Sequence, residues 1–139
     1  MQTFLPYSSY ILTAKCLDYR RLGKQRVECK QILQCLLGTG SLRWKNHPAV
    51  KMWKGYEESL AMYGYEICVE WISRGYKDSL KIFFGQYLDL MTPDVIDPPW
   101  MGNEAFHASH RSNLIRKFPE HYSKFCWRES GDLPYVWPV

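Results

Sequence analysis

Apolar residues that recur at helical spacing are the feature that most constrains the fold of this chain. A first run consists of Leu22, Cys29, Ile32, Leu33, Leu36 and Leu37. Its spacing predicts a helix over residues 19–37, which Gly38-Thr39-Gly40 ends. A second run predicts a helix that opens at Pro48 and closes at Gly75, with Gly55 and Gly64 as places where it could bend or split.

The rest of the chain continues the helical pattern. A third apolar run extends from Leu80 to Met91, and Pro93 ends it. The proline-containing stretch 93–102 is predicted to be a loop, after which Asn103 caps a helix to Lys117. Pro119 then opens a short helix through Phe125, and the tail is extended. No strand-like alternation is visible, so we expect an all-α, compact single domain over residues 1–139, with about three main helices plus short ones.

Charge is distributed unevenly along the 139 residues. The formal net charge is only +4, but residues 1–54 carry +8, residues 55–104 carry −6 and residues 105–139 carry +2. A basic first third favours a polyanionic partner such as nucleic acid. Lysine and arginine that merely solvate a surface would give the same composition.

The sequence also indicates a cellular setting. No run of 18 apolar residues is present, and the start Met-Gln-Thr-Phe-Leu-Pro lacks the pattern of a signal peptide. The five cysteines include no CxxC pair, which is typical of a reduced protein. We therefore expect an intracellular protein without a membrane segment.

The predicted helix over 19–37 carries the clearest chemical signal. Glu28 is the only acid between Tyr19 and Met52, and it shares one helical face with Arg21 and Lys24. A catalytic carboxylate within a phosphate-binding face, held ionised by the cations, is one interpretation. A surface helix with a local Glu–Lys pair is the other. The cations of this helix are Arg20, Arg21, Lys24, Arg26 and Lys30.

Two further polar segments are candidates for contacts with DNA. Residues 43–48 mix cations with Trp44, which could stack on a base or pack into the core at a helix entry. The polar stretch from His107 to Asn113 could reach phosphate oxygens through residues 109–113. A zinc site built from His107, His110, His121 and Cys126 would have unusual spacing, so no metal is expected.

Common catalytic motifs are missing from the sequence. It contains no GxSxG, Walker A, HExxH or GxGxxG pattern. Hydrolase triads, nucleotide hydrolysis and dinucleotide chemistry therefore have no support.

Three segments together resemble the pyrimidine-dimer DNA glycosylases of the endonuclease V type. The first is Leu17-Asp18 with Leu22 and Glu28. The second combines His47-Pro48, Trp53-Lys54-Gly55 and the stretch 70–76, Glu-Trp-Ile-Ser-Arg-Gly-Tyr. The third is the polar helix 107–117 with the aromatic segment 122–127. They span most of residues 1–127.

The resemblance implies a small all-α repair enzyme that combines DNA glycosylase and abasic-site lyase activity without a cofactor. Its nucleophile would be the α-amine of the first residue, here Met1, and its carboxylate would be Glu28. It implies a monomer that acts on double-stranded DNA containing a lesion. The residues expected to contact DNA are Gln2, Arg20, Arg21, Lys24, Arg26, Lys30, Arg43, Lys45, His47, His110 and Arg111.

The sequence departs from the family pattern at two places. The family exposes a small residue by removing the initiator methionine, whereas the long side chain of Gln2 predicts that Met1 is kept. Val27 precedes Glu28 where the family has arginine, and Gln31 stands where an arginine follows one turn later. Two alternatives stay open: a non-catalytic DNA-binding module on this scaffold, and a metal-dependent nuclease that uses His107 and His110.

Overall fold

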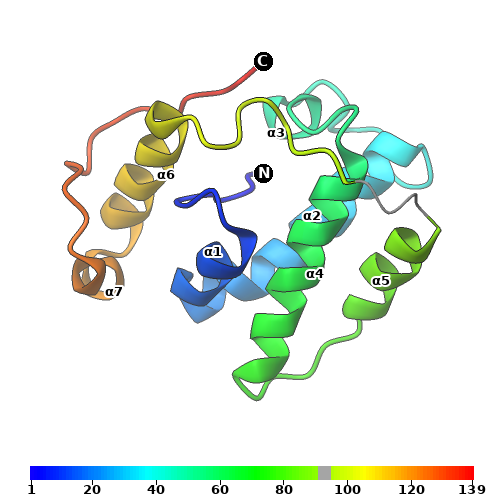
Figure 1. Ribbon diagram of the computed structural model, residues 1–139, viewed down its shortest axis with the longest axis horizontal. Helices are drawn as coiled ribbons and strands as arrows, with labels where there is room; N and C mark the ends of the chain where they lie inside the picture. The colour runs from blue at the N-terminus through cyan, green and yellow to red at the C-terminus, as the bar shows by residue number, and fades with distance from the viewer. Residues whose placement is uncertain (91–94) are drawn as a thin grey trace.

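The computed structural model describes residues 1–90 and 95–139, and these ranges contain α-helices, one short 3-10 helix and no β-strand. The predicted all-α class is confirmed (Figure 1). No helix in the described ranges is long and apolar enough to cross a membrane. The elements are α1 (Tyr10–Cys16), α2 (Tyr19–Leu37), α3 (Pro48–Lys51), α4 (Glu57–Ser73), α5 (Lys81–Asp89), α6 (Glu104–Lys117), α7 (Pro119–Tyr122) and the 3-10 helix Ser123–Phe125.

Helix α2 has the bounds that the sequence predicts. The carboxylate of Asp18 caps its start by accepting the Arg21 backbone N–H at 3.4 Å, and Gly38 ends it in the left-handed conformation. The Tyr122 hydroxyl, on α7, donates to Asp18 Oδ1 at 2.5 Å and so holds the capping carboxylate in place. Because these signals are local, the sequence alone was sufficient to predict this helix.

The long helix predicted over 48–75 is split at one of its two glycines. Gly55 has a φ of +87°, which separates α3 from α4. Gly64 does not interrupt α4. A Cβ there would meet the Phe84 ring at 2.5 Å, so this glycine instead allows α5 to pack closely against α4. Of the two glycines predicted as places where the helix could bend or split, Gly55 is the one at which it splits, and α4 continues through Gly64.

Helix α1 was not predicted. Ser9 caps it, because its hydroxyl accepts the Leu12 backbone N–H at 3.1 Å. At the other end of the chain, Asn103 caps α6 as expected, and α6 ends at Lys117. The predicted end of the third helix at Met91 and Pro93 lies outside the described residues.

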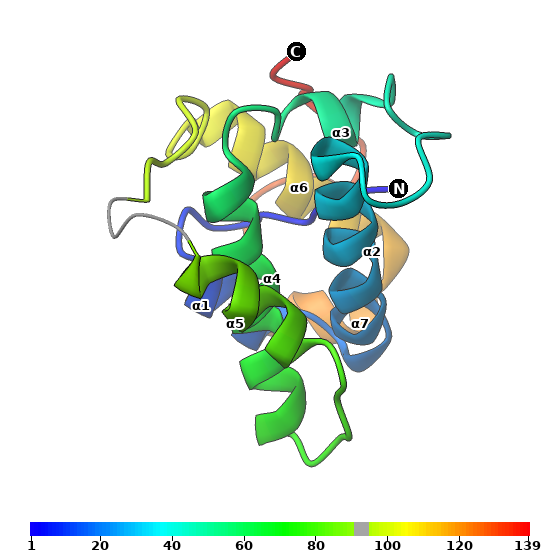
Figure 2. The same cartoon turned by 90° about the vertical axis from the view of Figure 1, so that its right-hand side faces the viewer.

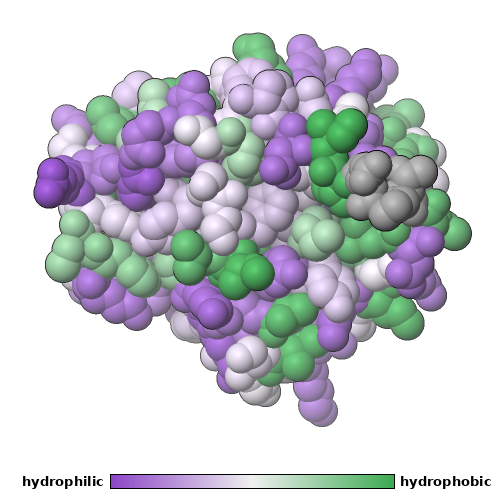
Figure 3. Space-filling model, viewed as in Figure 1, coloured by the Kyte–Doolittle hydropathy of each residue, from purple (hydrophilic) through white to green (hydrophobic). Residues whose placement is uncertain are grey.

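Helices α2 and α4 pack side by side through the middle of the molecule, and α1 and α5 pack against α4 (Figures 1 and 2). Helices α6 and α7 lie on the other side of the N-terminal segment. The face drawn in Figure 3 mixes hydrophilic and hydrophobic residues. The largest buried core side chains are Trp53, Tyr63, Tyr122, Phe84, Phe106, Leu5, Leu17, Leu22, Ile32, Leu33, Leu60 and Ile67.

Candidate active site

Residues 2–6 are buried and run between α2 and α6 (Figure 1). Side chains from other parts of the chain bond to their backbone. The Phe4 N–H donates to Gln25 Oε1 at 2.7 Å, and the Leu5 N–H donates to His110 Nδ1 at 3.0 Å. His107 Nδ1 donates to the Leu5 carbonyl at 2.8 Å. Since buried backbone groups require such partners, these bonds fix the path of the N-terminus.

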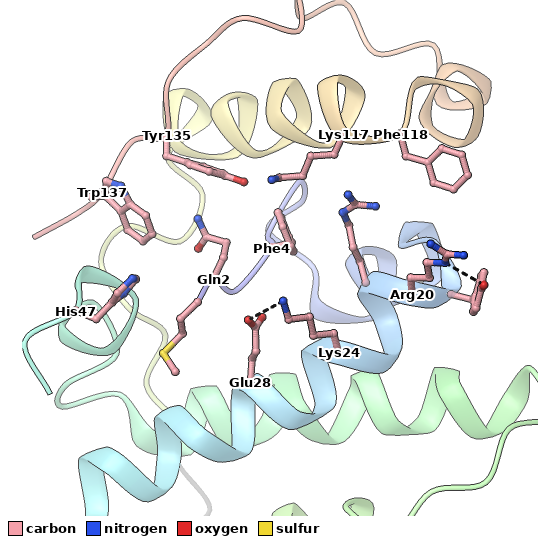
Figure 4. A pocket seen from close by; sticks show the side chains of 13 residues that line it. Gln2, Phe4, Arg20, Lys24, Glu28, His47, Lys117, Phe118, Tyr135 and Trp137 are labelled. Atoms are coloured by element: carbon pink, nitrogen blue, oxygen red, sulfur yellow. Dashed lines mark hydrogen bonds and ion pairs between the residues drawn. The ribbon is translucent and has the colours of Figure 1, made fainter. Parts of the chain in front are cut away.

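The N-terminus leads into a pocket of about 810 Å³ between α2, α6 and the C-terminal tail (Figure 4). The pocket therefore gathers residues from two separate parts of the chain, residues 1–47 and residues 117–137. It is lined by Met1, Gln2, Phe4, Tyr19, Arg20, Arg21, Lys24, Glu28, His47, Lys117, Phe118, Tyr135 and Trp137.

Glu28 projects from α2 into this pocket and is only 9% exposed. Burial raises the pKa of its carboxyl, whereas the charges of Lys24 and the Met1 α-ammonium lower it. Lys24 Nζ lies 4.0 Å from Glu28 Oε1. The net direction is upward, so desolvation outweighs the cations that the sequence suggested would hold this group ionised.

His47 is the N-cap residue of α3 and also faces the pocket. Its Nδ1 accepts the Ala49 backbone N–H at 3.0 Å, which caps α3 and leaves Nε2 to carry the proton of the neutral ring. Burial, followed by the charge of the Met1 α-ammonium, lowers the pKa of His47. The pocket thus surrounds the chain's first amine with one carboxylate and one neutral imidazole.

Cations from two helices meet on one side of the pocket. Burial lowers the pKa of Lys117, and the nearby charges of Arg21, Arg116 and Lys24 lower it further. Like charges held this close together favour an anionic ligand such as phosphate. No sequence signal points to Lys117 or Arg116, because their approach to α2 arises only in the folded chain.

An aromatic wall completes the pocket, and it too was not predicted. Tyr135 and Trp137 come from the tail, which is extended as expected. The tail is attached to α6: the Val136 N–H donates to Ser109 Oγ at 3.1 Å, and the Leu133 N–H donates to Ser112 Oγ at 2.9 Å. The polar side of α6 therefore holds the tail in place.

That role corrects the expectation that residues 109–113 form a face toward DNA. His110 is 1% exposed, and burial lowers its pKa to about 3. Arg111 is buried too, and it bonds to Glu104, to Glu129 at 2.6 Å and to the Pro6 carbonyl at 2.8 Å. Because His110 is buried and the guanidinium of Arg111 has internal partners, the structure does not leave these two side chains available to phosphate.

Four other cations expected at DNA also lie outside the residues that line the pocket. Arg26 bonds Asp78 at 2.9 Å and covers the Trp71 ring. Lys30 lies over the ring of Phe83. Arg43 and Lys45 are in an exposed turn after α2. Trp44 in that turn is 42% exposed, so the interpretation that packs it into the core is wrong.

His107 and His121, two of the candidate zinc ligands, bond to backbone groups instead. His107 Nε2 accepts the Gly102 N–H at 2.9 Å, and His121 Nε2 contacts the Cys16 carbonyl at 2.9 Å. Among residues 1–90 and 95–139, no group of three or more His, Cys, Asp or Glu side chains could hold a metal ion.

Comparison with known proteins identifies the family. The family model described as pyrimidine dimer DNA glycosylase matches residues 1–83, which is more than half of the chain. Searches of curated proteins and of solved structures gave no match. The matched range contains the buried N-terminal segment, Glu28 and His47, whereas the aromatic tail lies beyond it. The chain therefore belongs to the pyrimidine dimer DNA glycosylase family, with an endonuclease V-like, all-α fold.

Proposed function

We propose that this protein is a DNA repair glycosylase with abasic-site lyase activity, in which the Met1 α-amine is the nucleophile and Glu28 is the catalytic carboxylate. One observation carries the proposal. Met1 and Glu28 line the same pocket, close enough that the α-ammonium charge affects the pKa of the carboxyl. Family membership supports the reaction class.

The chemistry begins with the neutral form of the amine. Only the unprotonated amine has a lone pair that is free to attack. Its lone pair forms a bond to the sugar C1′ while the glycosidic C1′–N bond breaks. The base leaves with the electron pair of the broken glycosidic bond and takes up a proton. The C1′–O4′ bond then breaks, the amine nitrogen gives up a proton, O4′ takes one up, and the product is a Schiff base. Loss of a proton from C2′ then expels the 3′-phosphate.

Glu28 would act at two points in this sequence. Its ionised form stabilises the positive charge that develops on the sugar, because the two charges are close in a poorly solvated pocket. Its raised pKa also favours proton uptake and release during imine formation and elimination. Both roles follow from burial beside the N-terminus.

The other walls would hold the DNA. Arg21, Lys24 and Lys117 are positioned for phosphates next to the lesion. The rings of Phe4, Tyr135 and Trp137 would shelter a nucleotide moved out of the base stack. Double-stranded DNA with a damaged base is therefore the proposed partner of the monomer, and no cofactor takes part.

Side-by-side cleavage of ultraviolet-irradiated, abasic and undamaged duplexes tests the proposal. The untagged protein should nick the first two substrates and leave the third intact, and Glu28→Gln should abolish nicking. Glu66→Gln, which changes a carboxylate on α4 outside the pocket, should behave like the unsubstituted protein. DNA binding without nicking, unchanged in Glu28→Gln, would instead establish a non-catalytic binding module.

A further inference from the structure

One buried side-chain amide joins the N-terminal segment to the carboxylate. Gln25 is 1% exposed and lies on α2, three residues before Glu28. Its Nε2 donates to the Gln2 carbonyl at 2.7 Å and to Glu28 Oε2 at 3.2 Å. The two partners belong to different segments of the chain, and the same NH₂ group bonds to both.

The surroundings determine the orientation of this amide. Gln25 Oε1 accepts the Phe4 N–H at 2.7 Å. The Tyr63 hydroxyl lies 3.0 Å from the same oxygen, and its closer acceptor is the Phe4 carbonyl. A flipped amide would set its NH₂ against a backbone N–H and its oxygen against the Gln2 carbonyl. Only the observed orientation suits both the Phe4 N–H and the Gln2 carbonyl, so Gln25 presents its NH₂ donor to Glu28.

We propose that Gln25 is a positioning residue: its Nε2 group holds the Glu28 carboxylate at a fixed position relative to the first residues of the chain. This inference rests on the proposed function, because it concerns the geometry between Glu28 and the Met1 α-amine. Gln25 does not line the pocket and would not touch substrate. It acts through the carboxylate that it orients.

The hydrogen bond from Gln25 also affects the ionisation of Glu28. The groups that act on this carboxyl are Lys24 from α2, and the Met1 α-ammonium and Gln2 backbone N–H from the N-terminal segment. Tyr135 faces it from the tail. The donor on Gln25 favours the charged form and lowers the pKa of Glu28. Its removal should therefore raise that pKa further.

The test combines borohydride trapping on abasic-site DNA with a ¹³C-carboxyl titration of Glu28, which Glu28→Gln assigns. Gln25→Met removes both halves of the amide. Gln25→Glu keeps an oxygen for the Phe4 N–H and replaces the NH₂ donor with a second carboxyl oxygen facing Glu28. Ser59→Ala is the control, since it removes another buried hydrogen bond, the 2.5 Å contact with Tyr10 OH, away from the pocket.

We expect both Gln25 variants to trap roughly ten- to a hundredfold more slowly, because a small misplacement of a reacting group has effects of this size. Glu28 should titrate at higher pH in Gln25→Met and be unchanged in Ser59→Ala. Folded Gln25→Glu with full trapping, or an unshifted Glu28 in Gln25→Met, would overturn the inference. If the unsubstituted protein itself does not trap, the proposed function fails, while the titration still decides whether Gln25 holds Glu28.

Discussion

His110 Nδ1 accepts a hydrogen bond of 3.0 Å from the backbone N–H of Leu5, a residue 105 positions earlier in the chain. An accepting ring nitrogen cannot carry a proton, so this contact requires the unprotonated form at Nδ1. The ring is buried, which lowers its pKa to about 3. The fixed path of the N-terminus toward the pocket therefore depends on a neutral histidine.

This dependence predicts acid-sensitive stability. The folded pKa of His110 lies below its ordinary value of 6.5, so its contribution is fully present above pH 6.5 and is lost as the pH falls toward 3. The pKa of His107 is also lowered, so its protonation likewise reduces stability as the pH falls. The free energy of unfolding should fall by up to ~1.4 kcal/mol per pH unit for each proton taken up.

Urea unfolding between pH 7 and pH 4 measures this effect. His110→Gln should be less stable than the unsubstituted protein at pH 7 and should show a flatter pH dependence below 6.5. An equally steep decline in His110→Gln would exclude His110 as its source.

Glu28 should affect stability in the opposite sense. Burial raises its pKa in the folded protein, so the stability present below its ordinary value near 4.5 is lost as the pH rises through the raised value. Glu28→Gln, which removes the charge, should therefore melt at a higher temperature at pH 7. That advantage should disappear below pH 4.5. Thermal melts at both pH values test this prediction, with Glu66→Gln as the control. An unchanged melting temperature of Glu28→Gln at pH 7 would contradict it.

Lys117 should contribute to DNA binding through phosphate. Lys117→Ala should weaken binding to an abasic-analogue duplex and reduce the slope of log affinity against log salt by about 1. Fluorescence anisotropy over a salt series measures both quantities. Lys81→Ala is the matched control, because Lys81 lies on α5 beside Tyr65 and not at the pocket. Equal salt slopes for Lys117→Ala and Lys81→Ala would show that Lys117 does not contact DNA phosphates.

Arg26 should behave as a structural residue. Its guanidinium bonds the buried Asp78 carboxylate, and removal of one partner of a buried pair typically costs about 3 kcal/mol. Arg26→Ala should therefore lower the free energy of unfolding by about that amount and leave the salt slope of binding unchanged. A reduced slope of log affinity against log salt in the folded variant would show instead that Arg26 contacts DNA.

The sequence predicted those features whose signals are local. The bounds of α2 follow from one apolar run between Asp18 and Gly38, and Glu28 is conspicuous as a lone acid in a basic helix. The break at Gly55 is similarly local, because one residue adopts the left-handed conformation.

Features that depend on distant partners could not be predicted in this way. Helical spacing places Arg26 on a basic helix but says nothing of Asp78, 52 residues later. The polar side of α6 resembles a solvent-facing surface until the tail is seen attached to Ser109 and Ser112. The tail in turn brings Tyr135 and Trp137 to the pocket.

Borohydride trapping followed by peptide mass mapping tests the central claim most directly. The untagged protein would be incubated with abasic-site DNA, reduced and digested with trypsin. We predict a covalent DNA adduct on the α-amine of Met1 in the peptide 1–15, and no adduct in Glu28→Gln. An adduct on the side chain of Lys24, which lines the same pocket, or no adduct on any residue, would contradict the proposed role of Met1.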